Sequence, residues 1–223
     1  MNSDELLENP VLTPSGDELG KISDILIDRN TGEINSFFVE PESGGKPAYL
    51  LSESVSFKDG SFVVKDKSEM MDSPGEGDLA LGTSLLKTEV FAEPAWRIGV
   101  LADFGVDPDE WRLAELTVDV YPEYVITTDA HERLLPQGYP PVLQIRLPSY
   151  WATFHASEEG PKTRTHVVIS IQGEDLESSV AKRLTEEWDE EARSKRGTMP
   201  DESFRLRMID AVRAAFDDAY RMS

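Results

Sequence analysis

The sequence contains an internal repeat, and a repeat limits the fold strongly because similar sequences form similar structural units. Residues 19–28, LGKISDILID, align without a gap with residues 98–107, IGVLADFGVD. The same offset continues downstream and pairs Ile34 with Leu113, Phe37 with Leu116, Val39 with Val118 and Glu40 with Asp119. The shared motif positions are Gly20, Asp24 and Asp28 in the first copy and Gly99, Asp103 and Asp107 in the second. We therefore expect two tandem copies of one structural unit.

Each copy has the pattern of a β-hairpin, in which an alternating apolar run is followed by a polar turn and a second alternating run. The first turn, residues 28–33, contains Asn and Gly, which tolerate positive φ, and the second, residues 107–110, contains Pro, which presets φ. Residues 48–51 and 61–64 read as further short strands. The predicted architecture is mainly β.

The first copy resembles a known family. Residues 16–28, GDELGKISDILID, followed by TGEI at residues 31–34 and an apolar strand, resemble the PRC-barrel domain, which is named after the cytoplasmic part of the H subunit of photosynthetic reaction centres. The resemblance covers residues 10–66. The second copy, residues 79–147, shares the positions of Gly99 and Asp103 but has Pro94-Ala95-Trp96 where the family pattern has a turn of the type Gly-Asp-Glu.

The expected fold class is α+β and mainly β, with two tandem PRC-barrel-like modules followed by a helical segment. We expect the first module at residues 1–66, an acidic linker rich in Pro and Gly at 67–78, and the second module with an extended loop at 79–171. Residues 172–223 are expected to form two amphipathic helices.

The C-terminal segment changes its apolar spacing to that of helices. The first apolar stripe consists of Leu176, Val180, Leu184 and Trp188, and the second of Ile209, Val212, Phe216 and Ala219. Gly197 is expected to end the first helix and Pro200-Asp201 to begin the second. Such stripes need a covering surface, which the β-modules, the other helix or a second subunit could supply. The self-contact favoured by the sequence is a homodimer through Trp188, Phe216 and Tyr220.

The charge balance disfavours direct binding of DNA or RNA. Asp and Glu total 43 against 22 Lys and Arg, which gives a formal net charge of -21. Nucleic-acid binding draws much of its affinity from Lys and Arg that neutralise phosphates, and no dense basic stripe is present. An alternative origin of the acidity is adaptation to a very salty cytoplasm, where carboxylates keep a surface hydrated.

The chain contains no cysteine, so disulfides, thiolate metal sites and cysteine nucleophiles are excluded. The first eight residues are acidic where a signal peptide would be basic, and no stretch of about 18 apolar residues occurs. We therefore expect a cytoplasmic protein without a transmembrane segment.

No catalytic or cofactor motif stands out, and we expect neither an enzyme nor a bound cofactor. His131, His155 and His166 are scattered in the sequence, which favours structural or exposed roles. Asp24 and Asp28, like Asp103 and Asp107, are four residues apart, but the Gly and Glu of a calcium loop are absent, so turn capping is favoured over metal binding. The aromatic group Tyr150, Trp151 and Phe154 is interpreted as core filling rather than as a ligand platform.

Three functions are compatible with these patterns. The resemblance implies a protein-docking or assembly module, because PRC-barrel domains are known from reaction-centre organisation, ribosomal small-subunit maturation factors and archaeal cell-division components. The favoured hypothesis is accordingly a non-catalytic adaptor with a protein partner. The alternatives are a ribosome-maturation factor that reaches the ribosome through a protein, and an enzyme or small-ligand binder with a pocket in the second module.

Overall fold

The protein is described by a computed structural model that covers residues 1–42, 44–126, 142–157, 164–194 and 202–222. The chain divides into two compact units. Unit 1 comprises Met1–Thr88, Leu101–Thr117 and Arg146–His166, and unit 2 comprises Glu89–Val100, Val118–Ile145 and Val167–Ser223.

The first sheet has seven strands in the order β4-β3-β2-β1-β6-β5, and β7 pairs with β2. Its strands are β1 (Pro10–Leu12), β2 (Glu18–Asp28), β3 (Ile34–Glu40), β4 (Ala48–Leu51), β5 (Val55–Lys58), β6 (Ser61–Val64) and β7 (Leu79–Leu81). The short helices of this part are α1 (Ser3–Leu6), η1 (Ser52–Ser54), η2 (Lys67–Glu69) and α2 (Gly82–Leu85). The strands β1 and β6 are parallel, whereas β2 is antiparallel to β1, β3 and β7.

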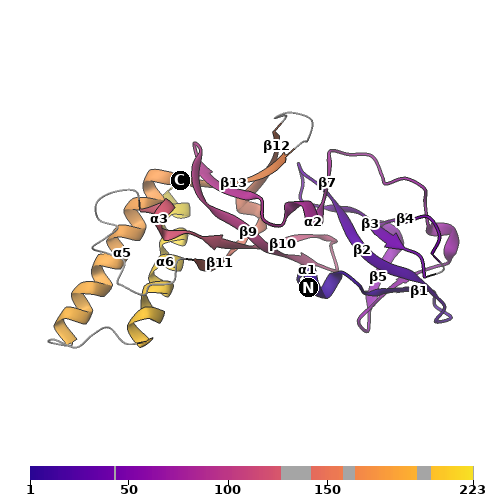
Figure 1. Cartoon of the computed structure of the whole chain (residues 1–223), viewed down its shortest axis with the longest axis horizontal. Coiled ribbons are helices and arrows are strands. Elements are labelled where there is room, and N and C mark those ends of the chain that lie inside the picture. The colour runs from indigo at the N-terminus through magenta and orange to yellow at the C-terminus, as the bar shows by residue number, and fades with distance from the viewer. Residues whose placement is uncertain (43, 127–141, 158–163, 195–201, 223) are drawn as a thin grey trace. The chain divides into compact units, whose positions relative to one another are not determined.

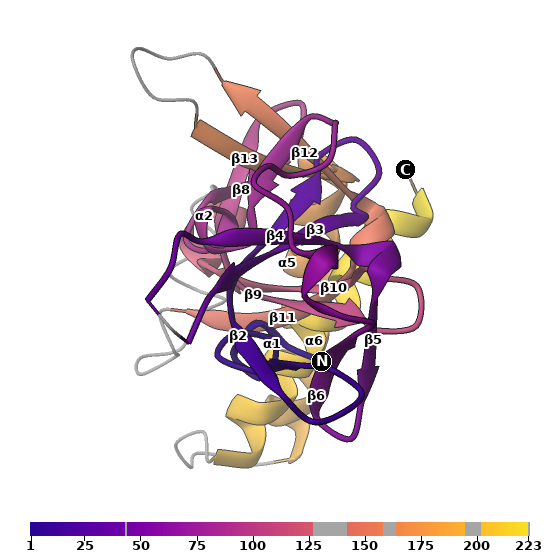
Figure 2. The same cartoon turned by 90° about the vertical axis from the view of Figure 1, so that its right-hand side faces the viewer.

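The first sheet encloses an aromatic and aliphatic core. Figure 2 shows β2, β3, β4, β5 and β6 arranged around this interior. The side chains of Ile22, Ile25, Ile27, Phe37, Leu50 and Phe62 are fully buried. The strict alternation expected for β2 fails because its pairing with β3 shifts register twice, between Ile22 and Asp24 and between Leu26 and Ile27. Such bulges re-aim side chains, and residues 25–27 are consecutively buried.

The second sheet repeats the strand order of the first. Its order is β11-β10-β9-β8-β13-β12, in which every strand takes the place of the strand numbered seven lower in the first sheet. The strands are β8 (Glu89–Glu93), β9 (Trp96–Asp107), β10 (Arg112–Val120), β11 (Leu143–Pro148), β12 (Ala152–Ser157) and β13 (Arg164–Gln172), with α3 (Pro122–Val125) and η3 (Ser149–Trp151) between them. The strands β8 and β13 are parallel, as β1 and β6 are. The prediction of two tandem β-modules followed by helices is confirmed.

Two long helices end the chain, α5 (Gly173–Ser194) and α6 (Glu202–Met222). They lie side by side within unit 2, and α6 returns along α5 (Figure 1). Both predicted apolar stripes contribute buried residues, among them Leu184 and Val212. The Arg207 guanidinium joins the helices through Glu191 and Glu187, and these hydrogen bonds raise its pKa above the usual value. The predicted boundary residues Gly197 and Pro200-Asp201 lie outside the described residues.

None of the helices in the described part of the chain is long and apolar enough to cross a membrane.

Candidate docking site

The two motif glycines occupy the same position in the two sheets, and at both positions a side chain would clash with the backbone of the neighbouring strand. A Cβ atom on Gly20 would lie 2.3 Å from the backbone oxygen of Glu40, and one on Gly99 would lie 2.0 Å from that of Asp119. Glu40 and Asp119 are the residues that the repeat pairs with each other. Both glycines therefore allow a close approach of the two hairpin strands, which a side chain would prevent.

Asp24 and Asp103 each hold the beginning of a short helix from the other copy. Asp24 accepts hydrogen bonds from the backbone N–H of Thr83 at 3.0 Å and from its hydroxyl, and Thr83 lies in α2. Asp103 accepts from the backbone N–H of Ser3 at 3.2 Å and from its hydroxyl, and Ser3 lies in α1. The two contacts are reciprocal and all four residues belong to unit 1. Each carboxylate satisfies helix N–H groups that have no partner within the helix.

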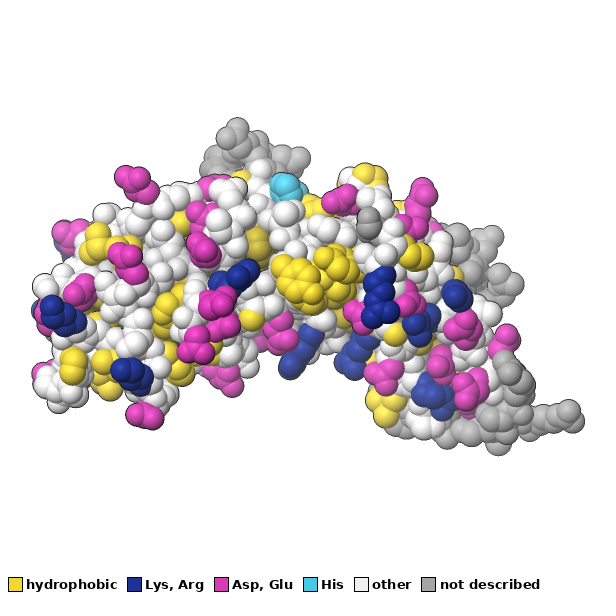
Figure 3. Space-filling model, turned by 180° about the vertical axis from the view of Figure 1, so that it is seen from behind, with side chains coloured by type: hydrophobic (Ala, Val, Ile, Leu, Met, Phe, Trp, Pro, Cys, Tyr) yellow, Lys and Arg dark blue, Asp and Glu magenta, His cyan; other side chains and the backbone are white. Residues whose placement is uncertain are grey.

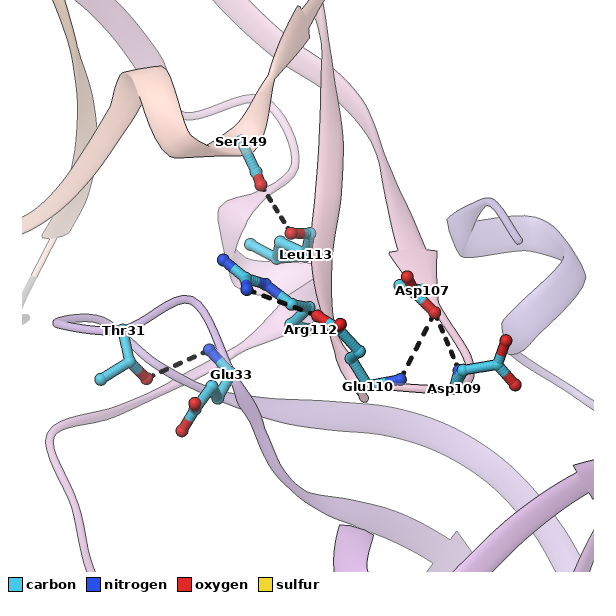
Figure 4. Close-up of polar contacts among 8 residues, drawn as sticks. All are labelled: Thr31, Glu33, Asp107, Asp109, Glu110, Arg112, Leu113 and Ser149. Carbon is cyan, nitrogen blue, oxygen red and sulfur yellow. Dashed lines mark hydrogen bonds and ion pairs between the residues drawn. The ribbon is translucent and has the colours of Figure 1, made fainter.

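Asp28 and Asp107 cap the two hairpin turns, as turn chemistry predicts. The Asp28 carboxylate accepts from the backbone N–H of Asn30 at 2.8 Å, and the Asp107 carboxylate accepts from that of Asp109 at 2.9 Å. Figure 4 shows the second of these turns, with Asp107 facing the backbone of Asp109 and Glu110. Among the described residues, no group of three or more His, Asp or Glu side chains is arranged to hold a metal ion.

The two hairpin tips cross within unit 1. The backbone N–H of Ile34 donates to the oxygen of Trp111 at 2.7 Å, and that of Leu113 donates to the oxygen of Gly32 at 2.9 Å. The repeat pairs Gly32 with Trp111 and Ile34 with Leu113, so these two bonds are again reciprocal. The tips of the two copies therefore support each other.

Trp111 is a structural residue that the sequence analysis missed. Its ring comes from the second copy but lies in the core of the first sheet, 4.7 Å from the ring of Phe37 and 5.6 Å from that of Phe62. Its indole N–H donates to the backbone oxygen of Val55 at 3.1 Å. The sequence hints at this role of Trp111 in one way: a large aromatic residue stands in a turn, at the position where the first copy has Gly32.

The structure describes two of the three histidines, and the three residues of the aromatic group differ in their exposure. His155 and His166 stack with ring centroids 5.4 Å apart, while His131 lies outside the described residues. Trp151 and Phe154 are buried, in agreement with core filling, but Tyr150 is 70% exposed. Tyr150 follows Ser149, whose hydroxyl is held by the backbone oxygen of Leu113 (Figure 4).

The residues expected at a helical interface lie in unit 2. Phe216 is buried inside this unit, and Trp188 packs edge-on against Phe204 of α6 with ring centroids 4.8 Å apart. Tyr220 is half-buried near the end of α6. Phe216 therefore already serves the packing of its own unit, and the homodimer stays a prediction.

A cavity of about 480 Å³ opens in unit 2 where the second copy departs from the repeat. It is lined by Pro94, Ala95, Trp96, Arg97, Glu123 and Tyr124. The equivalent turn of the first copy is polar: Asp17 accepts from the hydroxyl of Ser15 at 2.6 Å and donates its N–H to Thr13. The second copy therefore has an aromatic pocket in place of the polar turn of the first copy, and we call it the Trp96 pocket.

The walls of the Trp96 pocket are held in place. The indole N–H of Trp96 donates to the backbone oxygen of Tyr124 at 2.9 Å. Gly173, at the start of α5, packs so closely on Trp96 that a Cβ atom there would lie 2.6 Å from the Cβ atom of Trp96 and 2.7 Å from two atoms of its ring. The Arg97 guanidinium lies 4.8 Å from the centre of the Tyr124 ring and pairs with Glu89 at 3.1 Å. The aromatic side chains of the pocket are thus fixed by contacts within unit 2.

Acidic and basic side chains are interspersed on the face that Figure 3 shows, which also carries a compact hydrophobic cluster. Among the described residues, the linker carboxylate Asp78 pairs with Arg29, which lowers the pKa of Asp78.

Part of the chain matches a known family. Residues 1–71 match the family model of the PRC-barrel domain. No curated protein matches the chain significantly. The match covers β1 to β6 of the first sheet, whereas β7 and the second sheet, which has the same strand order, lie outside it. The motif around Gly20 and Asp24, which resembled this family in sequence, lies within the matched residues.

Proposed function

We propose that this protein is a non-catalytic docking adaptor, in which the second β-module binds a protein partner through the Trp96 pocket. The observation that carries the proposal is the aromatic pocket, which lies where the first copy has a polar turn instead. The first copy has the same strand order with a polar turn at this place, so the strand order alone does not require an aromatic residue there.

The residues of the pocket have the composition of binding hot spots. Trp, Tyr and Arg are enriched where protein interfaces gain most of their energy, and here Trp96, Tyr124 and Arg97 occur together. Pro94 and Ala95 at the rim are exposed, so a partner can reach the rings. Because the Trp96 ring is already held by its hydrogen bond to the Tyr124 backbone, a partner loses little free energy in ordering this ring.

The contacts of the other motif residues support a role for the repeat as a rigid platform. Asp24, Asp103 and Trp111 are engaged between the copies within unit 1. These groups are occupied by the chain itself and are unsuited to bind an external ligand. The aromatic residues Trp96 and Tyr124, which line an open pocket, therefore offer a better docking site than these motif residues.

The test compares the full chain with its Trp96→Ala variant. Both are immobilised and exposed to an extract of the native cells, and the retained partner is then purified and titrated against each. We expect a partner whose affinity falls at least about tenfold with the variant. A partner that binds both forms equally would refute docking at this pocket, and a copurifying small molecule displaced by the substitution would favour the ligand-binding alternative.

A further inference from the structure

We propose that the Trp96 pocket takes a bulky apolar side chain from a partner segment that carries lysine or arginine on both sides of it. This inference rests on the proposed docking function and specifies the chemistry of the partner.

The pocket surface is mainly apolar and aromatic. The indole N–H of Trp96 is used by the backbone oxygen of Tyr124. Pro94, the Trp96 ring and the Tyr124 ring contribute apolar surface, which gains free energy by covering an apolar side chain.

The cation that lines the pocket is already neutralised. Arg97 pairs with Glu89 at 3.1 Å, and its guanidinium lies over the Tyr124 ring. A carboxylate on the partner would have to compete with Glu89 for Arg97. Anionic partners are therefore disfavoured at this site.

Among the described residues, three further charged side chains that line the pocket, or that directly adjoin in sequence a residue that lines or touches it, are negative. Glu123 lines the pocket and is exposed. Glu93 directly precedes Pro94, and the exposed Glu174 directly follows Gly173, which touches the Trp96 ring. The whole chain carries a formal net charge of -21, so its field attracts cationic segments and speeds their association. Local and overall charge thus favour the same kind of partner.

Synthetic peptides test this chemistry on the full chain. The probes are three decapeptides of equal length: one with a central leucine flanked by lysines, one with the same leucine flanked by glutamates, and one with a central alanine flanked by lysines. Calorimetry gives the affinities. We expect the lysine-flanked leucine peptide to bind at least about tenfold more tightly than either of the others.

Charge reversal at the rim separates local recognition from general attraction. Glu123→Lys should weaken the lysine-flanked leucine peptide about fivefold or more, whereas Glu190→Lys changes the net charge equally on an exposed position of α5 and should leave the affinity nearly unchanged. Glu190 is 17 residues beyond Gly173, about 25 Å along the helix. Both variants alter exposed side chains, so both are expected to fold.

Three results would overturn the inference. They are equal binding of the two leucine peptides, equal binding of the leucine and alanine peptides, and equal effects of Glu123→Lys and Glu190→Lys. If these occur while Trp96→Ala still releases a native partner, docking at the pocket stands and the stated chemistry is wrong. If Trp96→Ala has no effect on the native partner either, the proposed function fails as well.

Discussion

Replacing Trp111 by alanine should destabilise the first sheet, although Trp111 belongs to the second copy of the repeat. The side chain is 8% exposed, so nearly all of its roughly 200 Å² leaves water on folding. At about 25 cal/mol per Å² this corresponds to about 5 kcal/mol, and truncations of buried tryptophans typically cost about 3 to 5 kcal/mol. The substitution also removes the hydrogen bond to the oxygen of Val55, worth about 1 kcal/mol. We therefore expect a loss of about 3 to 5 kcal/mol.

Urea unfolding of the full chain measures the total loss, and hydrogen exchange locates it. Backbone amides of β3 and β6, which carry Phe37 and Phe62, should exchange faster in Trp111→Ala. Trp188→Ala is the matched control, because its ring packs on Phe204 in unit 2, and it should leave exchange in β3 and β6 unchanged. A loss below about 1 kcal/mol with unaltered exchange in β3 and β6 would refute the insertion of Trp111 into the first sheet.

Three further predictions concern the repeat and its linker. Gly99→Ala should cost about 3 kcal/mol or more in thermal unfolding, because the new Cβ meets a backbone oxygen that cannot swing away, and a variant as stable as the parent would contradict this close approach. Thr83→Val should cost about 1 to 3 kcal/mol by leaving the buried Asp24 carboxylate without its hydroxyl partner, and a double-mutant cycle with Asp24→Asn should show coupling, whereas additive losses would speak against the contact. Because Arg29 lowers the pKa of Asp78, their ion pair should still be present at the ordinary carboxyl pKa of 3.8 and should be lost only as the pH falls below this value, through the folded pKa. The Arg29 Nε–H resonance reports this, and a signal whose change is half complete already at or above pH 3.8 would contradict the lowered pKa.

Several elements could be predicted because their signals are local. The hairpins around Gly20 and Gly99 follow from alternation and turn residues, and α5 and α6 follow from apolar residues at helical spacing. The repeat itself is visible without coordinates because equivalent positions keep equivalent residues. Alternation failed in β2, where two bulges bury residues 25–27 in succession, because bulges depend on the partner strands.

The candidate site was only partly accessible to sequence reasoning. The departure at Pro94-Ala95-Trp96 was evident from the repeat, but its meaning was not, because the pocket needs Tyr124 on α3 and Gly173 on α5 to hold the Trp96 ring. Likewise, the histidines were judged scattered, yet His155 and His166 stack on neighbouring strands. Such contacts join residues that are distant in sequence.

By itself the sequence determined that this chain is a tandem β-repeat with a helical end, because periodicity, turns and repetition are encoded by neighbouring residues. Only the tertiary structure decided that Asp24 and Asp103 hold helices from opposite copies and that Trp111 fills the first sheet. The Thr83 and Ser3 contacts span 59 and 100 residues of chain. No local pattern specifies such pairings, since they arise when two folded copies cover the polar and apolar groups that each leaves open.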